Sequence, residues 1–186
     1  MECDAVDKET VTGINLSNLD LAGTLPTLLG QLGTLNSLIL SQNIVHGSIP
    51  KEIANLPHLE IIDISENEIS GTIPDFASPL LKKLLLKNNR LTGTLPYDLG
   101  QRHERLITFD VMHNYITGPI PESIKVLENL DTFSISENDF TGTIPSSISE
   151  SKVLRYLYMD NNHLMGTIPT RYVHGHVCVH AKHSFF

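Results

Sequence analysis

The residues of this chain best suited to chemistry gather near its C-terminus. His174, His176, Cys178 and His180 alternate with other residues, so a strand would place all four on one face. Imidazole and thiolate at this spacing are a plausible zinc or copper ligand set. The alternative is a tail that binds nothing, because ligands on a flexible segment must supply their own ordering entropy. We expect the alternative, and hence no metal and no cofactor.

The sequence contains no motif for a known catalytic centre. G-x-S-x-G, H-E-x-x-H, a Gly-rich phosphate loop and the kinase motifs are all absent from it. Asp63 and Asp110 occupy equivalent positions of a repeated pattern, two repeats apart. Stacked strands would separate them by roughly 10 Å, too far for an acid/base pair. We therefore expect a protein that is not an enzyme.

The repeated pattern is clearest from Leu130 to Pro145, where the sequence reads LDTFSISENDFTGTIP. Similar segments close on prolines separated by 24, 24, 22, 25, 24 and 24 residues, namely Pro26, Pro50, Pro74, Pro96, Pro121, Pro145 and Pro169. A near-constant period of this size is typical of a solenoid, in which each repeat forms one coil and buries its apolar side against its neighbours.

Each coil is predicted to open with a short strand that directs two apolar side chains inward. These pairs run from Ile14 and Leu16 in the first coil to Leu157 and Met159 in the last. An asparagine follows the strand in six coils, at Asn43, Asn67, Asn89, Asn114, Asn138 and Asn162. Its amide can satisfy backbone groups of a buried turn, so we expect a ladder of asparagines. The first coil has Leu19 there, where the ladder should end.

The second half of each coil predicts a further short strand and then a helical turn. Pro119 replaces the Thr or Ser of the other coils and lacks an N–H, so a second ladder should have a gap there. Helix-like spacing follows most of the closing prolines, as in Ile53 and Leu56 or Ile124 and Leu127. The segment after Pro74 is two residues short and contains Pro79, so it should be the least helical.

The pattern resembles the plant-type leucine-rich repeat, LxxLxLxxNxLxGxIPxxLGxLxx, over about residues 11–172. The resemblance implies an α/β fold: a right-handed solenoid of about seven coils. A parallel β-sheet would line its concave face and short helical or 3₁₀ turns its convex face. It also implies ligand recognition, as in the ectodomains of receptor-like kinases and receptor-like proteins or in polygalacturonase-inhibiting proteins. Such parents are extracellular or associated with the plasma membrane.

Both ends of the sequence depart from the pattern. Plant-type repeat domains usually begin with a cap that holds two nearby cysteines, and Cys3, just before VTGINLS, resembles the second of them. Residues 1–10 are therefore interpreted as a cap remnant, with an ordinary free thiol as the alternative. Residues 173–186 form a non-repeat, His-rich tail in which we expect no further strand. Cys3 and Cys178 should lie too far apart to form a disulfide.

Charge and hydropathy narrow the class of partner and the compartment. The formal net charge is −8, which argues against nucleic acid and anionic membranes as partners. No apolar run approaches the roughly 18 residues of a membrane span. The acidic, polar start of the sequence does not resemble a signal peptide. The sequence therefore leaves the compartment undecided.

The concave side of the sheet is the expected ligand-binding face, because its side chains are not needed for the core. Apolar residues cluster there, and acids outnumber bases, so we expect a neutral or basic protein or peptide rather than pectin. The candidate residues are Ile39, Ile61, Asp63, Lys83, Leu85, Asp110, Met112, His113, Tyr156 and Tyr158. Two alternatives remain: an inhibitor of a secreted glycan-degrading enzyme, or a truncated repeat fragment without an independent function.

Overall fold

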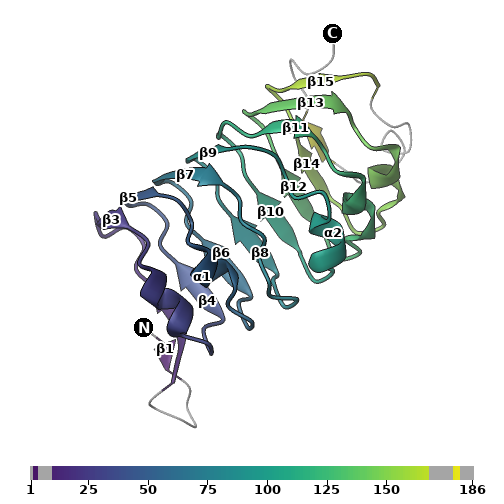
Figure 1. The fold of residues 1–186 in the computed structure, drawn as a ribbon. Helices are drawn as coiled ribbons and strands as arrows, with labels where there is room; N and C mark the ends of the chain where they lie inside the picture. The colour runs from purple at the N-terminus through teal and green to yellow at the C-terminus, as the bar shows by residue number, and fades with distance from the viewer. Residues whose placement is uncertain (1, 4–9, 168–177, 181–186) are drawn as a thin grey trace.

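One long sheet runs the length of the molecule (Figure 1). The computed structural model describes residues 2–3, 10–167 and 178–180. The sheet has nine strands in chain order: β1 (Glu2–Cys3), β2 (Val11–Asn15), β4 (Ser37–Ile39), β6 (Ile61–Asp63), β8 (Lys83–Leu85), β10 (Thr108–Asp110), β12 (Thr132–Ser134), β14 (Tyr156–Tyr158) and β16 (Cys178–His180). Neighbouring strands are parallel, except that β1 is antiparallel to β2.

A second row of strands forms two smaller parallel sheets. The four-stranded sheet contains β3 (Ala22–Thr24), β5 (Ile44–Gly47), β7 (Glu68–Thr72) and β9 (Arg90–Thr92). The three-stranded sheet contains β11 (Thr117–Pro119), β13 (Asp139–Thr143) and β15 (His163–Met165). β9 and β11 belong to different sheets and are joined by an isolated bridge between Thr94 and Thr117, where the N–H groups of Tyr115 and Thr117 still donate to the carbonyls of Leu91 and Gly93. The predicted gap is therefore confirmed, and Pro119 explains it because proline cannot donate to the preceding coil.

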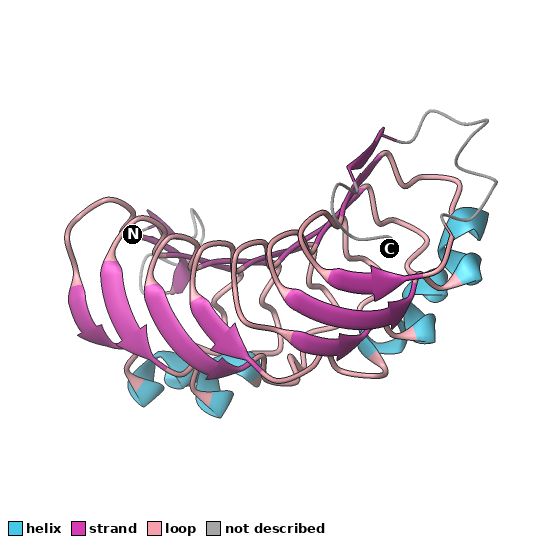
Figure 2. Cartoon of the chain, turned by 90° about the horizontal axis from the view of Figure 1, so that it is seen from above, coloured by secondary structure: helices cyan, strands magenta, loops and turns pink. Residues whose placement is uncertain are grey.

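In five coils of the described residues, the other side carries a short helical segment: η1 (Thr27–Gln31), α1 (Lys51–Ala54), α2 (Leu99–Arg102), η2 (Glu122–Val126) and η3 (Ser146–Glu150). Figure 2 shows them along the outer, convex edge of the arc. All but α2 begin directly after the proline that closes the repeat pattern. Residues 75–80 form no helix, which confirms the prediction for the short coil. No helix in the described ranges is long and apolar enough to cross a membrane.

The core lies between the sheet and the helical segments. Its largest fully buried side chains include Phe109, Phe133 and Phe140, and the rings of the first two stack with centroids 5.4 Å apart. Leu16, predicted to be buried, is 38% exposed, so that prediction was wrong. Leu16 belongs to the first coil, where it lines an apolar hollow instead of packing between two coils.

The turn after each main strand passes through the left-handed backbone region. The residue before each ladder position has φ between 53° and 59°, at Asn18, Gln42, Glu66, Asn88, His113, Glu137 and Asn161. The glycine later in the coil is also left-handed, as Gly93 shows with φ +81°. A Cβ atom added there would lie 2.8 Å from Thr72 Cγ2 in the preceding coil. Close stacking of coils therefore requires glycine at this position.

The C-terminal end of the sheet differs from our expectation. We predicted no strand after the last coil, yet β16 pairs with β14, with Val179 opposite Leu157. The N–H of Met159 donates to the carbonyl of His180 over 2.9 Å. Val179 packs against the core, where Leu157 and Met159 are fully buried. The prediction failed because three residues suffice for this strand, and they match no part of the repeat.

Candidate ligand-binding face

Two rows of side chains cross the concave sheet at right angles to the strands. Strand register places Ile39, Asp63, Leu85, Asp110, Ser134 and Tyr158 in the first row. It places Ser37, Ile61, Lys83, Thr108, Thr132 and Tyr156 in the second row. Eight of the ten candidate residues lie in these rows. Met112 and His113 lie in the turn after β10, beyond Asp110.

Solvent reaches every one of the candidate side chains. Lys83, His113 and Tyr156 are exposed, and the others are half-buried. Ile39, Ile61 and Leu85 stand on three neighbouring strands, so part of their apolar surface meets water together. The inward neighbours Leu38, Ile62 and Leu84 are fully buried. The face therefore offers apolar surface that the core does not need.

The two carboxylates of the first row accept hydrogen bonds from the turns that follow their own strands. Asp63 Oδ1 accepts the Ser65 N–H over 3.1 Å, and Asp110 Oδ1 accepts the Met112 N–H over 3.0 Å. Burial raises the pKa of Asp110, while hydrogen bonds from Met112 and Ser134 and the charge of Lys87 oppose the rise. Leu85 stands between the two aspartates. They do not converge on a shared position, as acid/base catalysis would need.

Aromatic rings occupy the C-terminal end of both rows. The rings of Tyr156 and Tyr158 are parallel within 4°, with centroids 6.4 Å apart. The ring of His180 stacks on Tyr158 at 4.9 Å. The place of His180 on this face was not predicted from the sequence. The alternation of Val and Cys before it, in VCVH, was the available signal for a strand.

His113 projects from the turn beside another acidic side chain. Its Nδ1 lies 4.0 Å from Glu137 Oε2 in the next coil, and both side chains are largely exposed. Both residues have left-handed backbones. This contact is a surface pair and holds no buried charge in place.

The ladder asparagines join each coil to the one before it. Asn114 shows the common arrangement: its Oδ1 accepts the Leu91 N–H, and its Nδ2 donates to the carbonyls of Leu86, Val111 and Met112. Equivalent bonds involve Asn43, Asn67, Asn89, Asn138 and Asn162. The side chain supplies the partners that the turn backbone lacks.

The tail set of metal-ligating residues is only partly placed. His174 and His176 lie outside the described residues, whereas Cys178 and His180 belong to β16. Among the described residues, no group of three His, Cys, Asp or Glu side chains could hold a metal ion. Cys3 and Cys178 lie in the two edge strands of the sheet, eight strand spacings or roughly 38 Å apart.

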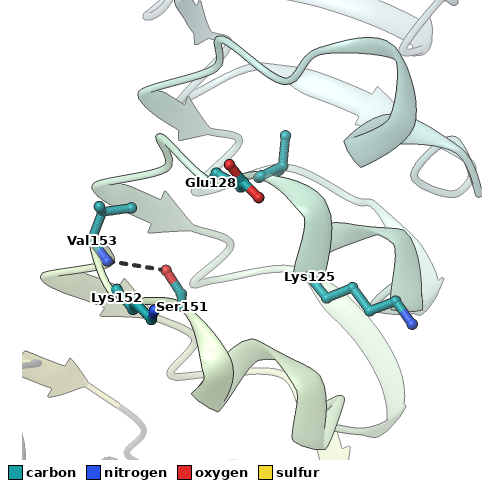
Figure 3. A pocket seen from close by; sticks show the side chains of 6 residues that line it. Lys125, Glu128, Ser151, Lys152 and Val153 are labelled. Atoms are coloured by element: carbon teal, nitrogen blue, oxygen red, sulfur yellow. Dashed lines mark hydrogen bonds between the residues drawn. The ribbon is translucent and has the colours of Figure 1, made fainter.

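Three hollows lined by described residues lie away from the rows. One of about 370 Å³ lies on the convex side between η2 and the start of the next coil, lined by Lys125, Leu127, Glu128, Ser151, Lys152 and Val153 (Figure 3). Its charged side chains are exposed, and Ser151 Oγ accepts the Val153 N–H. Another of about 350 Å³ lies between η1 and α1. The third, of about 360 Å³, is the apolar hollow beside Leu16.

Known proteins share this arrangement. Residues 58–80, 80–101, 129–151 and 153–172 match the family model described as Leucine Rich Repeat. The structure is similar to the plant peptide hormone receptor RGFR1, solved in complex with RGF2, at 34% identity and a TM-score of 0.86; the match covers 92% of this chain and 28% of that chain. No curated protein matches the sequence.

Two further receptor structures give the same result. The ectodomain of the Arabidopsis receptor kinase HAESA, in complex with an N-terminally extended IDA peptide hormone, is 30% identical with a TM-score of 0.80, over 85% of this chain and 27% of that one. Pollen Receptor Kinase 3 is 27% identical with a TM-score of 0.70, over 98% of this chain and 77% of that one. This chain thus spans little more than a quarter of the length of RGFR1 and HAESA. The repeats, the stacked parallel strands and these similarities together identify the chain as a plant-type leucine-rich-repeat domain.

Proposed function

We propose that this domain is a non-catalytic recognition module that binds an extended peptide or protein segment along its concave face. The observation that carries the proposal is the first row, in which Ile39, Asp63, Leu85 and Asp110 alternate apolar and acidic side chains. Ile61 and Lys83 lie beside them in the second row. The apolar members can bury against a ligand while the carboxylates fix its orientation.

The dimensions of the row suit an extended chain. Its four strands are joined by three spacings of about 4.8 Å, so the row spans roughly 14 Å, the length of four or five extended residues. Over the concave positions, Asp63, Glu66, Asp110, Glu137 and Asp160 outnumber Lys83 and Lys87. This balance favours a neutral or basic segment over an acidic polysaccharide.

The similar structures support the same type of ligand. RGFR1 and HAESA were solved with RGF2 and with an IDA peptide hormone, respectively. Those complexes concern ectodomains several times longer than this chain. We therefore propose for this domain only the step they share, recognition of a peptide, together with a parent that is extracellular or attached to the plasma membrane.

A peptide-display experiment tests the proposal. Linear peptides selected on the wild-type domain should bind Leu85→Arg more than tenfold more weakly, a loss of about 1.4 kcal/mol. The matched control is Lys125→Glu, an exposed change in η2 on the convex side, which should leave affinity unchanged. Circular dichroism should be the same for all three proteins. Peptides that lose binding through Lys125→Glu and keep it with Leu85→Arg would place recognition on the convex side instead.

A further inference from the structure

One motif on the concave face has no role in the proposed peptide groove. Asn15, Leu16 and Ser17 read N-x-S, the acceptor sequence for N-linked glycosylation. The 186 residues contain this sequence once. Because such a tripeptide also arises by chance, the structure around Asn15 decides whether the folded domain can carry an oligosaccharide.

The amide nitrogen of Asn15 is available on the surface. Asn15 is the last residue of β2 and is exposed. Its Oδ1 accepts the backbone N–H of Ser17 over 3.2 Å and the hydroxyl of Ser17 over 2.5 Å. Both bonds use the oxygen, whereas the sugar of an N-linked oligosaccharide is joined to Nδ2. The modification would therefore disturb neither bond.

A ladder asparagine shows the opposite arrangement. Asn43, in the next coil, is only 8% exposed, and its Nδ2 donates to the carbonyls of Leu16, Leu40 and Ser41. A sugar on that nitrogen would break bonds that join two coils. The two bonds of Asn15, by contrast, stay within its own coil.

The strands around Asn15 leave space beside it. β1 pairs with β2 at Val11 and Gly13, whereas β4 pairs with β2 as far as Asn15. Within the described residues, Asn15 therefore has a neighbouring strand only on the β4 side. An oligosaccharide, which is bulky and strongly hydrated, has room on the outer side of β2.

The position of Asn15 links the motif to the peptide groove. Asn15 lies opposite Ile39, one strand spacing of about 4.8 Å before the N-terminal end of the first row. Several sugar rings at this position would stand over β2, next to the groove. A peptide that binds between Ile39 and Asp110 would meet the oligosaccharide if it extended past Ile39.

We propose that Asn15 carries an N-linked oligosaccharide that closes the N-terminal end of the first row. Because the donor and the transferase belong to the secretory pathway, the inference rests on the extracellular or membrane-attached parent of the proposed function. In the transfer, Asn15 Nδ2 forms a bond to the anomeric carbon of a lipid-linked oligosaccharyl pyrophosphate. The bond from that carbon to the pyrophosphate breaks, the pyrophosphate leaves with the bonding electrons, and a base of the transferase takes one amide proton.

Secretion of the full chain tests the modification. With a cleavable secretion signal, the protein recovered from the medium of plant cells should carry an oligosaccharide on Asn15, located by peptide mass spectrometry and removed by a peptide N-glycosidase. Ser17→Ala should abolish the modification, and Ser17→Thr should retain it. Asn18 and Asn129 are internal controls, because both are exposed and each is followed by Leu-Asp instead of Leu-Ser. Neither should be modified.

Two results would overturn the modification. One is secreted wild-type protein in which Asn15 is unmodified, and the other is an oligosaccharide that persists in Ser17→Ala. Translation in the presence of microsomes gives the same decision for a variant that does not fold, because the transferase acts on the nascent chain. Protease-protected wild-type chains without the modification would refute the proposal there too.

Two measurements test the position of the oligosaccharide. In NMR with a soluble paramagnetic probe, relaxation of the Ile39 methyl groups should be at least twofold slower in the glycosylated domain than in Ser17→Ala, and that of the Leu85 methyl groups should be equal. Equal relaxation at Ile39 would show that the sugar points away from the row. Peptides selected on the glycosylated domain should bind Ser17→Ala within twofold. Stronger binding would show that the sugar covers the groove, and weaker binding that it contacts the peptide; either would refute its role at the end of the row.

Failure of this inference and failure of the proposed function give different results. An unmodified Asn15, together with selected peptides that depend on Leu85, would refute the oligosaccharide and leave the peptide groove intact. A modified Asn15 with no Leu85-dependent peptide would support the oligosaccharide and refute the groove.

Discussion

The two ends of the solenoid are built from the same repeat, yet equivalent side chains are buried to different degrees at the two ends. Leu16 and Met159 hold equivalent positions in the first and last coils, but Leu16 is 38% exposed and Met159 is fully buried. At the C-terminal end, β16 adds a strand and Val179 packs on the core. At the N-terminal end, the same layer opens into an apolar hollow of about 360 Å³.

The difference shows that a repeat does not determine the burial of its own residues. Each coil supplies one layer of side chains, and a layer is closed only when something packs on its far face. β16 does this for the last coil although it follows no repeat pattern. Mutations at equivalent positions of the two ends should therefore have unequal effects.

The largest difference should come from truncating the equivalent inward residues. Met159→Ala removes a fully buried core side chain directly after β14 and should lower the free energy of unfolding by about 2–5 kcal/mol. Leu16→Ala should cost less than about 1 kcal/mol, because much of that side chain is already in water. Urea unfolding of both variants measures the contrast. Equal losses would show that the hollow beside Leu16 is as well packed as the other end.

Loss of a ladder asparagine should destabilise the last coil as much as a central coil. Asn162 accepts the Phe140 N–H and donates to Ile135, Met159 and Asp160, so all its partners lie in the last two coils. Asn162→Ala and Asn114→Ala should therefore destabilise equally, by about 1–3 kcal/mol, because each leaves buried turn groups unpaired. Urea melts give the comparison. A near-zero effect at Asn162 with a full effect at Asn114 would mean that the ladder, too, weakens toward the C-terminal end.

The stability that β16 itself contributes should be smaller than the effects of Met159 and of the ladder asparagines. Val179→Asp places a charge against the core and should destabilise the domain by about 1–2 kcal/mol. It should also speed hydrogen exchange at the Met159 amide, which donates to His180. Val153→Asp makes the same substitution at a valine that is 40% exposed and should change neither quantity. Unchanged exchange at Met159 in the Val179 variant would show that β16 does not close this end.

Most of the fold could be predicted because the repeat specifies it many times over. The period, the strands, the gap at Pro119 and the missing helix after Pro74 each depend on residues within one coil. Burial at the ends could not be predicted, since it depends on what packs against Leu16 or Met159. The left-handed turns were also missed, because several fall on types such as Gln42 and Glu66 that do not favour positive φ.

The candidate site, like the fold, could be predicted from the sequence only in part. Register within a parallel sheet follows from the repeat, so the first row, with Ile39, Leu85 and Asp110, could be predicted from spacing alone. The stacking of Tyr156, Tyr158 and His180 could not, because it depends on the orientations of the three rings and on a strand outside the repeat. Side-chain orientation is a property of local packing and carries no periodic signal.

The smallest expected effect is a gain at the N-terminal end. Leu19 occupies the ladder position of the first coil and is 55% exposed, while Asn18 before it has the same left-handed φ, 55°, as the other coils. The turn thus begins with the common geometry, although Asp20 after it is also left-handed, with φ 51°, unlike its equivalents in the other coils. In Leu19→Asn, the new Nδ2 should donate to the carbonyls of Leu16 and Ser17, as Asn43 does to Leu40 and Ser41.

Because the lost leucine is mostly in water, these bonds should raise the free energy of unfolding by about 0.5 kcal/mol. Leu28→Asn, at a leucine of η1 that is 67% exposed, is the matched control and should have no effect. A loss of stability in Leu19→Asn, measured in the same urea series, would mean that Leu19 protects the apolar hollow. A residue of the first coil would then partly cover the apolar core at the N-terminal end. The two ends would differ only in how much of the core is covered.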